Sequence, residues 1–362
     1  MKTAYWVVVL GGWLSATAVF GQALVGAVNE LAAWPKNGPL LVEMADLKVN
    51  VLEEDRAGFN ALQRNFGVEQ LAGRIVHMSA EVRGEDILQG TRPYYGAKIQ
   101  VDATTGKGPL NYGLPIPLGT FDWRRVERTD YYPADLQRAA LSVGFQESAG
   151  TLWLRNFRVD VLGWPISIAA AANMGYVDDV AGDGQGGWAD QGPENDARVL
   201  APLLKALTYE GVPFMPEMGE KAVLVMRSPK FPAGLPAAMA AVKAPGPARF
   251  LYVLHALSRG TPEGTAGVGM ITVVGDEGRS QQFVVRENVD VGDWQEPQPV
   301  GNGRVVLKAQ RADGGDSGLY ASKFALNADL GKICELRFIA QSERAVWIVA
   351  AVTASEMNFE MP

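Results

Sequence analysis

A segment rich in glycine and aspartate, residues 173–198, interrupts the chain and excludes regular structure where it stands. It reads NMGYVDDVAGDGQGGWADQGPENDAR and holds six glycines and five aspartates. Glycine at this density indicates backbone positions with positive φ or close approach, and closely spaced Asp and Asn favour turns made by side chain and backbone. The segment is therefore predicted to be neither a helix nor a strand.

The same segment carries large apolar side chains, at Met174, Tyr176 and Trp188. A flexible linker consists of Gly and Ser with little else, whereas these residues need a surface to pack on. We therefore expect an ordered loop.

Short runs of alternating polarity precede the loop. From Val76 to Arg83 apolar residues alternate with polar ones, which is typical of a half-buried strand. Similar runs occur at Leu41 to Leu47, Ile99 to Val101, Leu141 to Phe145 and Phe157 to Val161. One helix is expected before the loop, over residues 57–71, because apolar residues recur there at helical spacing: Phe59, Leu62 and Phe66.

Strands return after the loop, following one short helix expected within residues 195–207. Phe250 to Leu254 and Val346 to Val352 are continuous apolar runs, as expected of strands buried on both faces. No alternation of strands with helices indicates βαβ units. The sequence predicts an all-β chain of two antiparallel β-sandwich domains, residues 40–163 and 164–356.

Composition limits the class of protein. The chain has 362 residues, of which 48% are hydrophobic and 20% charged, which fits two globular domains. Its net charge of −7, without a Lys/Arg cluster, argues against nucleic acid as a partner. The single cysteine, Cys334, excludes an intramolecular disulfide and a cysteine-based zinc site.

The first residues, MKTAYWVVVLGGWLSATAVFGQA, contain one Lys, an apolar run and then small residues. This layout predicts a secretory signal peptide over residues 1–23. A membrane anchor is the competing interpretation, but glycines interrupt the run and no basic stop-transfer cluster follows. We expect an exported protein, extracellular, on the cell surface or periplasmic, with no membrane span after cleavage.

Spaced motifs between Gly119 and Val159 suggest a family. They are GTFDW at Gly119 to Trp123, PAD at Pro133 to Asp135, GFQ at Gly144 to Gln146 and GTLW at Gly150 to Trp153. This order resembles jelly-roll carbohydrate-binding modules of the galactose-binding-like superfamily. Such modules usually carry an aspartate, often tied to structural calcium, two residues after the last Trp. Arg155 stands there, so the resemblance implies no calcium in this domain.

The second half resembles β-sandwich modules attached to secreted bacterial glycosidases and to bacterial surface proteins. The matching pieces are DGQGGWADQG at Asp183 to Gly192, FLYVLH at Phe250 to His255, DVGDW at Asp290 to Trp294, and the terminal strand IVAAVT. The resemblance implies carbohydrate binding and little about activity.

Sugar sites combine flat aromatic faces with polar side chains that hydrogen-bond hydroxyl groups. The candidates for carbohydrate contacts are Arg92, Tyr94, Tyr95, Tyr112, Trp188 and Trp294. The alternative for the tyrosines is that they close the ends of the sandwich. Trp123 and Trp153 are flanked by apolar residues within strands, so we expect them in the core.

The loop offers hard oxygen ligands for a structural calcium ion, above all Asp178, Asp179, Asp183 and Asp190. Their spacing differs from the EF-hand pattern, so the hypothesis rests on ligand chemistry alone. The alternative is a set of turns made by Asp side chains, which would hold Trp188 against the sandwich.

The leading hypothesis is a secreted, non-catalytic protein that binds polysaccharide or oligosaccharide. One alternative is a surface-layer or filament subunit that self-associates through its sheet edges. Another is a glycan-cleaving enzyme with a site between the domains, which would need two facing carboxylates. No GxSxG or HExxH motif supports other hydrolytic chemistry.

Overall fold

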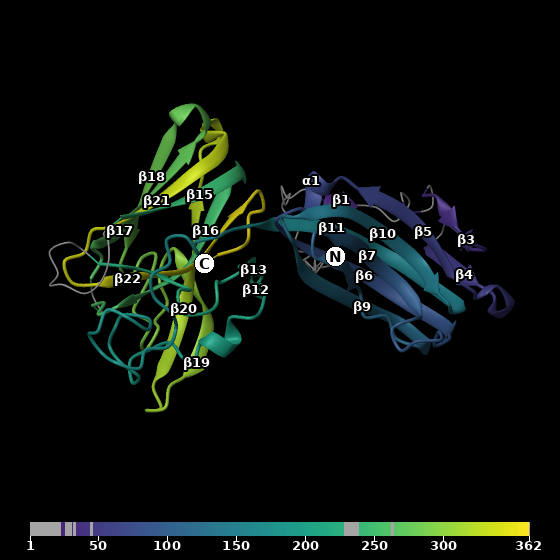
Figure 1. Ribbon diagram of the computed structural model, residues 1–362, viewed down its shortest axis with the longest axis horizontal. Coiled ribbons are helices and arrows are strands. Elements are labelled where there is room, and N and C mark those ends of the chain that lie inside the picture. The colour runs from purple at the N-terminus through teal and green to yellow at the C-terminus, as the bar shows by residue number, and fades with distance from the viewer. Residues whose placement is uncertain are drawn as a thin grey trace, which may run out of the picture.

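The computed structural model describes residues 23–25, 31, 34–43, 46–227, 239–261 and 264–361. These residues form two β-sandwiches that lie side by side (Figure 1). The all-β prediction is confirmed. The predicted signal peptide lies outside the described residues, apart from Ala23.

The helices with described bounds are short. They are α1 (Val68–Leu71) and the 3-10 turns Glu53–Asp55, Ala201–Leu203, Asp276–Gly278 and Ala328–Leu330. Among the residues described, no helix has the length and apolar character needed to cross a bilayer.

The first sandwich packs two sheets face to face. Sheet A has the order β3 (Leu41–Glu43), β4 (Leu47–Val51), β11 (Gly150–Ile166), β6 (Arg74–Ile87) and β9 (Gly119–Tyr132), and β1 (Ala23–Val25) also pairs with β11. Sheet B has the order β2 (Lys36–Asn37), β5 (Phe59–Phe66), β10 (Leu136–Gln146), β7 (Ala97–Thr105) and β8 (Gly108–Gly113). This strand order is that of a jelly roll, as the resemblance implied.

Alternation along the strands builds the core of the first sandwich. On β6, Val76, Met78, Ala80 and Val82 are all buried, as their period of two predicted. On β7 and β10 the inward residues include Ile99, Val101, Leu141 and Val143. The polar side chains between them point to the outer faces of the sheets.

The expected helix over residues 57–71 is wrong. Its first part is the strand β5, and only Val68–Leu71 is helical. Leu62 and Phe66 are four residues apart, which suits one side of a strand as well as one side of a helix. Pairing of β5 with β10 decides between the two, from Phe66 opposite Ala139 to Phe59 opposite Gln146.

The expectation that Trp123 and Trp153 belong to the core is also wrong. Both lie half-buried on the outer face of sheet A. The guanidinium of Arg155 lies 4.1 Å from the ring centroid of Trp123, and that of Arg83 lies 4.8 Å from the ring centroid of Trp153. These cation–π contacts cover and stabilise the two indole rings at the surface of the sheet.

The second sandwich repeats the jelly-roll order. Sheet C has the order β19 (Gly303–Gln310), β20 (Asp316–Ala325), β16 (Phe250–Ser258) and β22 (Val346–Ser355), with β14 (Leu224–Met226) also paired to β22. Sheet D has the order β15 (Met239–Pro247), β21 (Lys332–Ala340), β17 (Gly267–Gly275) and β18 (Ser280–Arg286). A small hairpin joins β12 (Thr208–Tyr209) to β13 (Val212–Pro213).

Sheet C is buried on both faces, as the apolar runs of β16 and β22 predicted. One face packs on sheet D, through residues such as Leu251 and Val349. The other face packs against the glycine-rich loop and the segments that follow it, through residues such as Tyr252 and Ile348. The loop therefore serves as a third layer of the domain.

The loop is ordered in the way that its composition predicted. Met174 and Trp188 are fully buried and Tyr176 is nearly so, all within the cluster on sheet C. Positive φ values occur at Gly182, Gly184, Gly186 and Gly192. Trp188 and Asp190 share this conformation, with φ of 55° and 56°.

One strand connects the two sandwiches. β11 pairs with β6 up to Gly163, and its last three residues, Trp164 to Ile166, pair with Val352 to Ala354 of β22. The buried cluster of the first domain ends at Val161 and the next begins at Trp164, on either side of the expected boundary. The boundary thus lies inside a strand.

Candidate functional site

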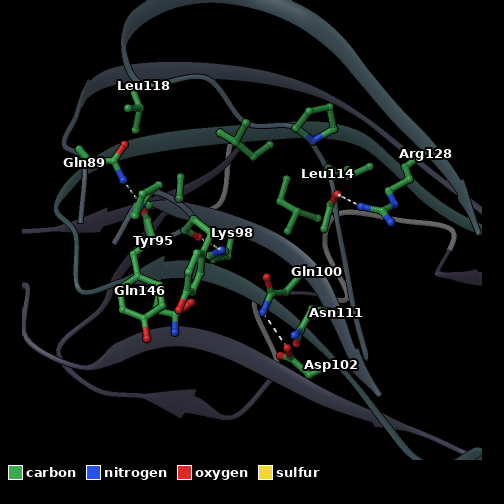
Figure 2. Close-up of a pocket in the computed structure, with 18 residues that line it drawn as sticks. Gln89, Tyr95, Lys98, Gln100, Asp102, Asn111, Leu114, Leu118, Arg128 and Gln146 are labelled. Atoms are coloured by element: carbon green, nitrogen blue, oxygen red, sulfur yellow. Dashed lines mark hydrogen bonds between the residues drawn. The ribbon is translucent and has the colours of Figure 1, made fainter. Parts of the chain in front are cut away.

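The outer face of sheet B presents a row of polar side chains. Because Ile99 and Val101 point into the core, their neighbours Lys98, Gln100 and Asp102 point outward from β7. Figure 2 shows these side chains along the floor of a cleft of about 580 Å³. This volume lies within the range of small-ligand sites.

Hydrogen bonds across three strands fix the floor of the cleft. Strand pairing sets Gln63 and Gln100 on either side of Ser142. Gln63 Nε2 donates to Ser142 Oγ at 3.3 Å, and Ser142 Oγ donates to Asp102 Oδ2 at 3.4 Å. Gln100 Nε2 donates to Asp102 Oδ1 at 2.7 Å. The carboxylate of Asp102 is therefore the shared acceptor of this network.

Small residues on neighbouring strands leave room above the floor. Gly113 of β8 lies opposite Gln100, and Gly144 of β10 lies opposite Lys98. A Cβ at Gly144 would come within 2.1 Å of the carbonyl oxygen of Asn60, so the close approach of β5 and β10 requires glycine there. Gly113 lines the cleft, so a side chain of ordinary size there would occupy part of it.

Two tyrosines form the rim of the cleft. Tyr94 is 60% exposed, and its ring centroid lies 4.8 Å from that of Tyr95 in an edge-to-face arrangement. Arg92 Nη1 donates to the hydroxyl of Tyr94 at 2.7 Å. Gln89 Nε2 holds the loop by donating to the carbonyl oxygens of Arg92 and Tyr95 at 2.7 and 2.8 Å. An exposed aromatic face thus stands beside a polar floor.

Partial burial changes the acidity of the groups in the cleft. Desolvation raises the pKa of Asp102, and hydrogen bonds from Gln100 and Ser142 oppose this shift. Desolvation lowers the pKa of Lys98, whose Nζ donates to the carbonyl oxygen of Tyr94. Arg128, at the far end of the cleft, donates to the carbonyl oxygen of Gly113 at 3.3 Å and forms an ion pair with Asp130.

The structure brings together three of the predicted sugar-binding residues, Arg92, Tyr94 and Tyr95. Tyr112 lies elsewhere, which corrects its assignment as a ligand contact. Its ring packs in the core, 4.4 Å from that of Tyr132, and its hydroxyl donates to the carbonyl oxygen of Tyr131 at 3.0 Å. It closes the sandwich, as the alternative proposed.

The assignment of Trp188 and Trp294 as sugar contacts is also wrong, because both side chains are buried. They are 0% and 1% exposed, and their ring centroids lie 5.7 Å apart in the layer over sheet C. Because the loop folds back onto the sheet, both rings are removed from solvent and cannot stack on a sugar.

The carboxylates of the loop accept hydrogen bonds mainly from backbone amides of the same loop. Asp178 accepts from the amides of Val180 and Gly192, Asp190 from those of Gly182 and Gly184, and Asp183 from that of Gln185. Asp179 accepts from Arg198. Within the described ranges, no three acidic, His or Cys side chains gather where a metal ion could bind. These side-chain turns are those of the alternative to calcium.

Sequence reasoning missed the floor of the cleft. The floor residues Lys98, Gln100 and Asp102 belong to a strand, where the sequence assigns polar residues to solvent. The same holds for Gln63 and Ser142, which join their hydrogen-bond network. The alternation on β7 did mark which side faces out. What it lacked was the arrangement of neighbouring strands, on which the cleft depends.

No protein-family model and no curated protein matches the chain. Among solved structures, it is similar to the C-terminal family 22 carbohydrate-binding module of Clostridium thermocellum Xyn10B, at 16% identity and a TM-score of 0.30 over 40% of this chain and 96% of that one.

Two further solved structures are similar at the same level. The tandem of family 22 modules from Paenibacillus barcinonensis Xyn10C has 11% identity and a TM-score of 0.30, over 94% of this chain and 99% of that one. A family 4 carbohydrate-binding module has 12% identity and a TM-score of 0.26, over 40% and 90% of the two chains. Because identities and TM-scores are this low, the ligand has to be inferred from the side chains themselves.

Proposed function

We propose that this is an exported, non-catalytic protein whose first domain binds polysaccharide in the cleft of sheet B. The observation that carries the proposal is the combination in one cleft of a tyrosine pair, of which Tyr94 is exposed, with a fixed row of amide and carboxylate groups. Sugar rings need such a pairing, since they have one apolar face and a rim of hydroxyls. The secretory layout of residues 1–23 supports export.

Binding without cleavage is supported by the acidic groups of the cleft. Among the residues that line it, Asp102 is the carboxylic acid. Glycosidases place two carboxyl groups on either side of the bond they break. With one carboxyl group, the cleft suits hydrogen bonding to hydroxyls, and we expect no release of reducing ends from a glycan that binds.

Calorimetry or affinity electrophoresis against a panel of soluble polysaccharides tests the proposal, with Tyr94→Ala as the main variant. Loss of the stacking face should weaken binding by about 1–1.5 kcal/mol, roughly a tenfold rise in Kd. Leu41→Ala is the matched control, because Leu41 is 59% exposed but lies on β3 of the other sheet. Uniformly flat titrations, or equal losses in both variants, would contradict the proposal.

A further inference from the structure

A second, smaller groove lies where β11 passes from one sandwich to the other. Its volume is about 320 Å³, and it is lined from the first domain by Arg74 and Tyr131, and from the second by Trp164, Ser167, Lys243 and Gly246. This volume is near the lower end for small-molecule sites, so the groove suits a single small unit. The sugar cleft of sheet B has none of these residues.

Two buried N–H donors in this groove have no acceptor. Trp164 is 8% exposed, and its Nε1 has no hydrogen-bond partner among the described residues. Nε of Arg74 is likewise buried and without a partner there. A buried donor without an acceptor is costly, and most native donors avoid that state. Two orphaned donors on one groove therefore indicate a ligand that supplies acceptors.

The rest of the Arg74 side chain is held in place. Its Nη2 donates to the carbonyl oxygen of Glu69 at 3.1 Å, and its guanidinium lies 5.3 Å from the ring centroid of Trp164. Burial lowers the pKa of Arg74, while Glu356 acts in the opposite direction. No carboxylate forms an ion pair with Arg74 in the part of the chain that is described. The guanidinium is thus positioned, with the charge of Glu356 nearby but no carboxylate within ion-pair distance among the described residues.

The second domain packs against the indole of Trp164. A Cβ at Gly246 would stand 2.8 Å from Nε1 of Trp164, closer than side chains pack, so the approach of this strand to the indole requires glycine. Lys243, on the same strand, is exposed and adds a second cation at the mouth of the groove. β15 is bulged between these two residues, which sets the glycine over the indole.

We propose that this groove binds a small carboxylate, whose oxygens accept hydrogen bonds from Nε1 of Trp164 and Nε of Arg74. An ionised carboxylate brings acceptors only, whereas a hydroxyl would bring a donor of its own. Hydrogen bonds from a guanidinium to a carboxylate are also the stronger, charge-assisted kind. A uronic acid unit of a polysaccharide and a free organic acid are the two sources of this chemistry.

The indole N–H of Trp164 reports on the groove directly. In a nitrogen–proton correlation spectrum of the full chain, assigned with Trp164→Phe, its resonance should move downfield and saturate as glucuronate is added. Glucose, the neutral match, should leave it in place. Acetate distinguishes the sources: a saturable shift with both acids supports any small carboxylate, and a shift with glucuronate alone supports a uronic acid unit. A shift with glucose equal to that with glucuronate, or no shift with either acid, would overturn the proposal.

Two variants test the cations. Arg74→Gln should weaken glucuronate binding about tenfold or more, because a charge-assisted hydrogen bond is lost. Lys243→Gln changes an exposed residue, so it tests the site even where Arg74→Gln unfolds, and it should weaken binding roughly two- to threefold. Unchanged affinity in Lys243→Gln together with unchanged affinity in a folded Arg74→Gln would refute the site. Tyr94→Ala should leave the glucuronate shift intact, since the sugar cleft is separate.

Discussion

Asp102 shows how a single residue couples binding to stability. Its carboxylate accepts hydrogen bonds from Gln100 and Ser142 and orients the floor of the cleft. Partial burial raises its pKa, so the ionised form destabilises the folded domain at neutral pH. A site that holds polar groups ready for a ligand commonly costs stability in this way.

Asp102→Asn should therefore raise the thermal midpoint and weaken glycan binding. The amide keeps an acceptor for Gln100 but carries no charge, so we expect Tm to rise by about 1–2 °C at neutral pH. The folded-state pKa of Asp102 is raised, so its ionisation cost is present above that pKa and absent at lower pH, where the gain should vanish.

Calorimetry of both variants at neutral and acidic pH measures this difference, with Glu54→Gln as the exposed control. Glycan affinity should fall about tenfold in Asp102→Asn alone, since a carboxylate forms stronger hydrogen bonds to hydroxyls than an amide does. A midpoint that falls at neutral pH would contradict this account of Asp102.

Residue by residue, the sequence predicted the rim of the cleft better than its floor. Tyr94, Tyr95 and Arg92 stand in a turn-rich run, and such runs lie at the surface. Trp188 and Trp294 were wrong candidates because the segments that carry them cover a sheet face, which buries both rings. Burial depends on what packs above a segment, and local composition does not contain that information.

Among the elements, the glycine-rich loop replaces a layer that helices provide in other folds. Its turns are held by carboxylates that accept hydrogen bonds from backbone amides. Two of these residues, Asp178 and Asp196, are almost completely buried. Asp196 also forms an ion pair with Arg198 at 2.8 Å. The loop can therefore keep its shape through its own hydrogen bonds.

Chelation should accordingly leave thermal unfolding unchanged. We expect the same midpoint with and without EDTA, because the oxygens of Asp178 and Asp190 already accept from four amides of the loop. A midpoint that drops by several degrees, and returns when calcium is added, would establish an ion in the loop.

Two Asp variants distinguish further between a loop held by its own hydrogen bonds and a loop held by a calcium ion. Asp178→Ala should destabilise the protein by about 1–3 kcal/mol, because the amide of Gly192 loses its acceptor in a buried position. Asp183→Ala, at an exposed position with one amide contact, should cost less than about 1 kcal/mol.

Strands were predicted well where apolar and polar residues alternate. They were predicted poorly where the spacing of apolar residues fits a helix as well as a strand. β6, β7 and β10 have one apolar and one polar side, and that period is local information. In β5, Leu62 and Phe66 are four residues apart, a spacing that both a strand and a helix allow. Only pairing with β10 settles the choice, and β10 lies far along the sequence.

At the scale of the whole molecule, a buried histidine ties the stability of the second domain to pH. His255 is completely buried between sheets C and D. Its Nδ1 accepts from Nε1 of Trp347 at 3.1 Å, and its Nε2 lies 2.9 Å from Oγ of Ser322. Desolvation lowers its pKa from 6.5 to about 3, so the ring is neutral in the folded protein.

Stability should therefore fall as the solution becomes acidic. The folded-state pKa of His255 is depressed, so its contribution is complete above pH 6.5 and is lost progressively as pH falls toward 3. One such group lowers the free energy of unfolding by about 1.4 kcal/mol per pH unit in that window.

His255→Gln supplies the matched comparison, because it keeps hydrogen-bonding groups but does not titrate. Urea unfolding between pH 4 and pH 6 should show the free energy of unfolding changing with pH more steeply in the wild type, by about 1.4 kcal/mol per pH unit. Equal slopes in the two proteins would show that His255 is accessible to protons while the domain is folded.

The continuity of β11 has a mechanical consequence. A swivel between the sandwiches would break the hydrogen bonds of Trp164 to Ile166 with β22, which are part of one sheet running through both domains (Figure 1). The polysaccharide proposed as the ligand of the first domain would thereby be kept at a set angle to the second. Tension on that polysaccharide would act on the backbone hydrogen bonds between β11 and β22, so the two domains would respond as one rigid unit and not as two units on a flexible linker.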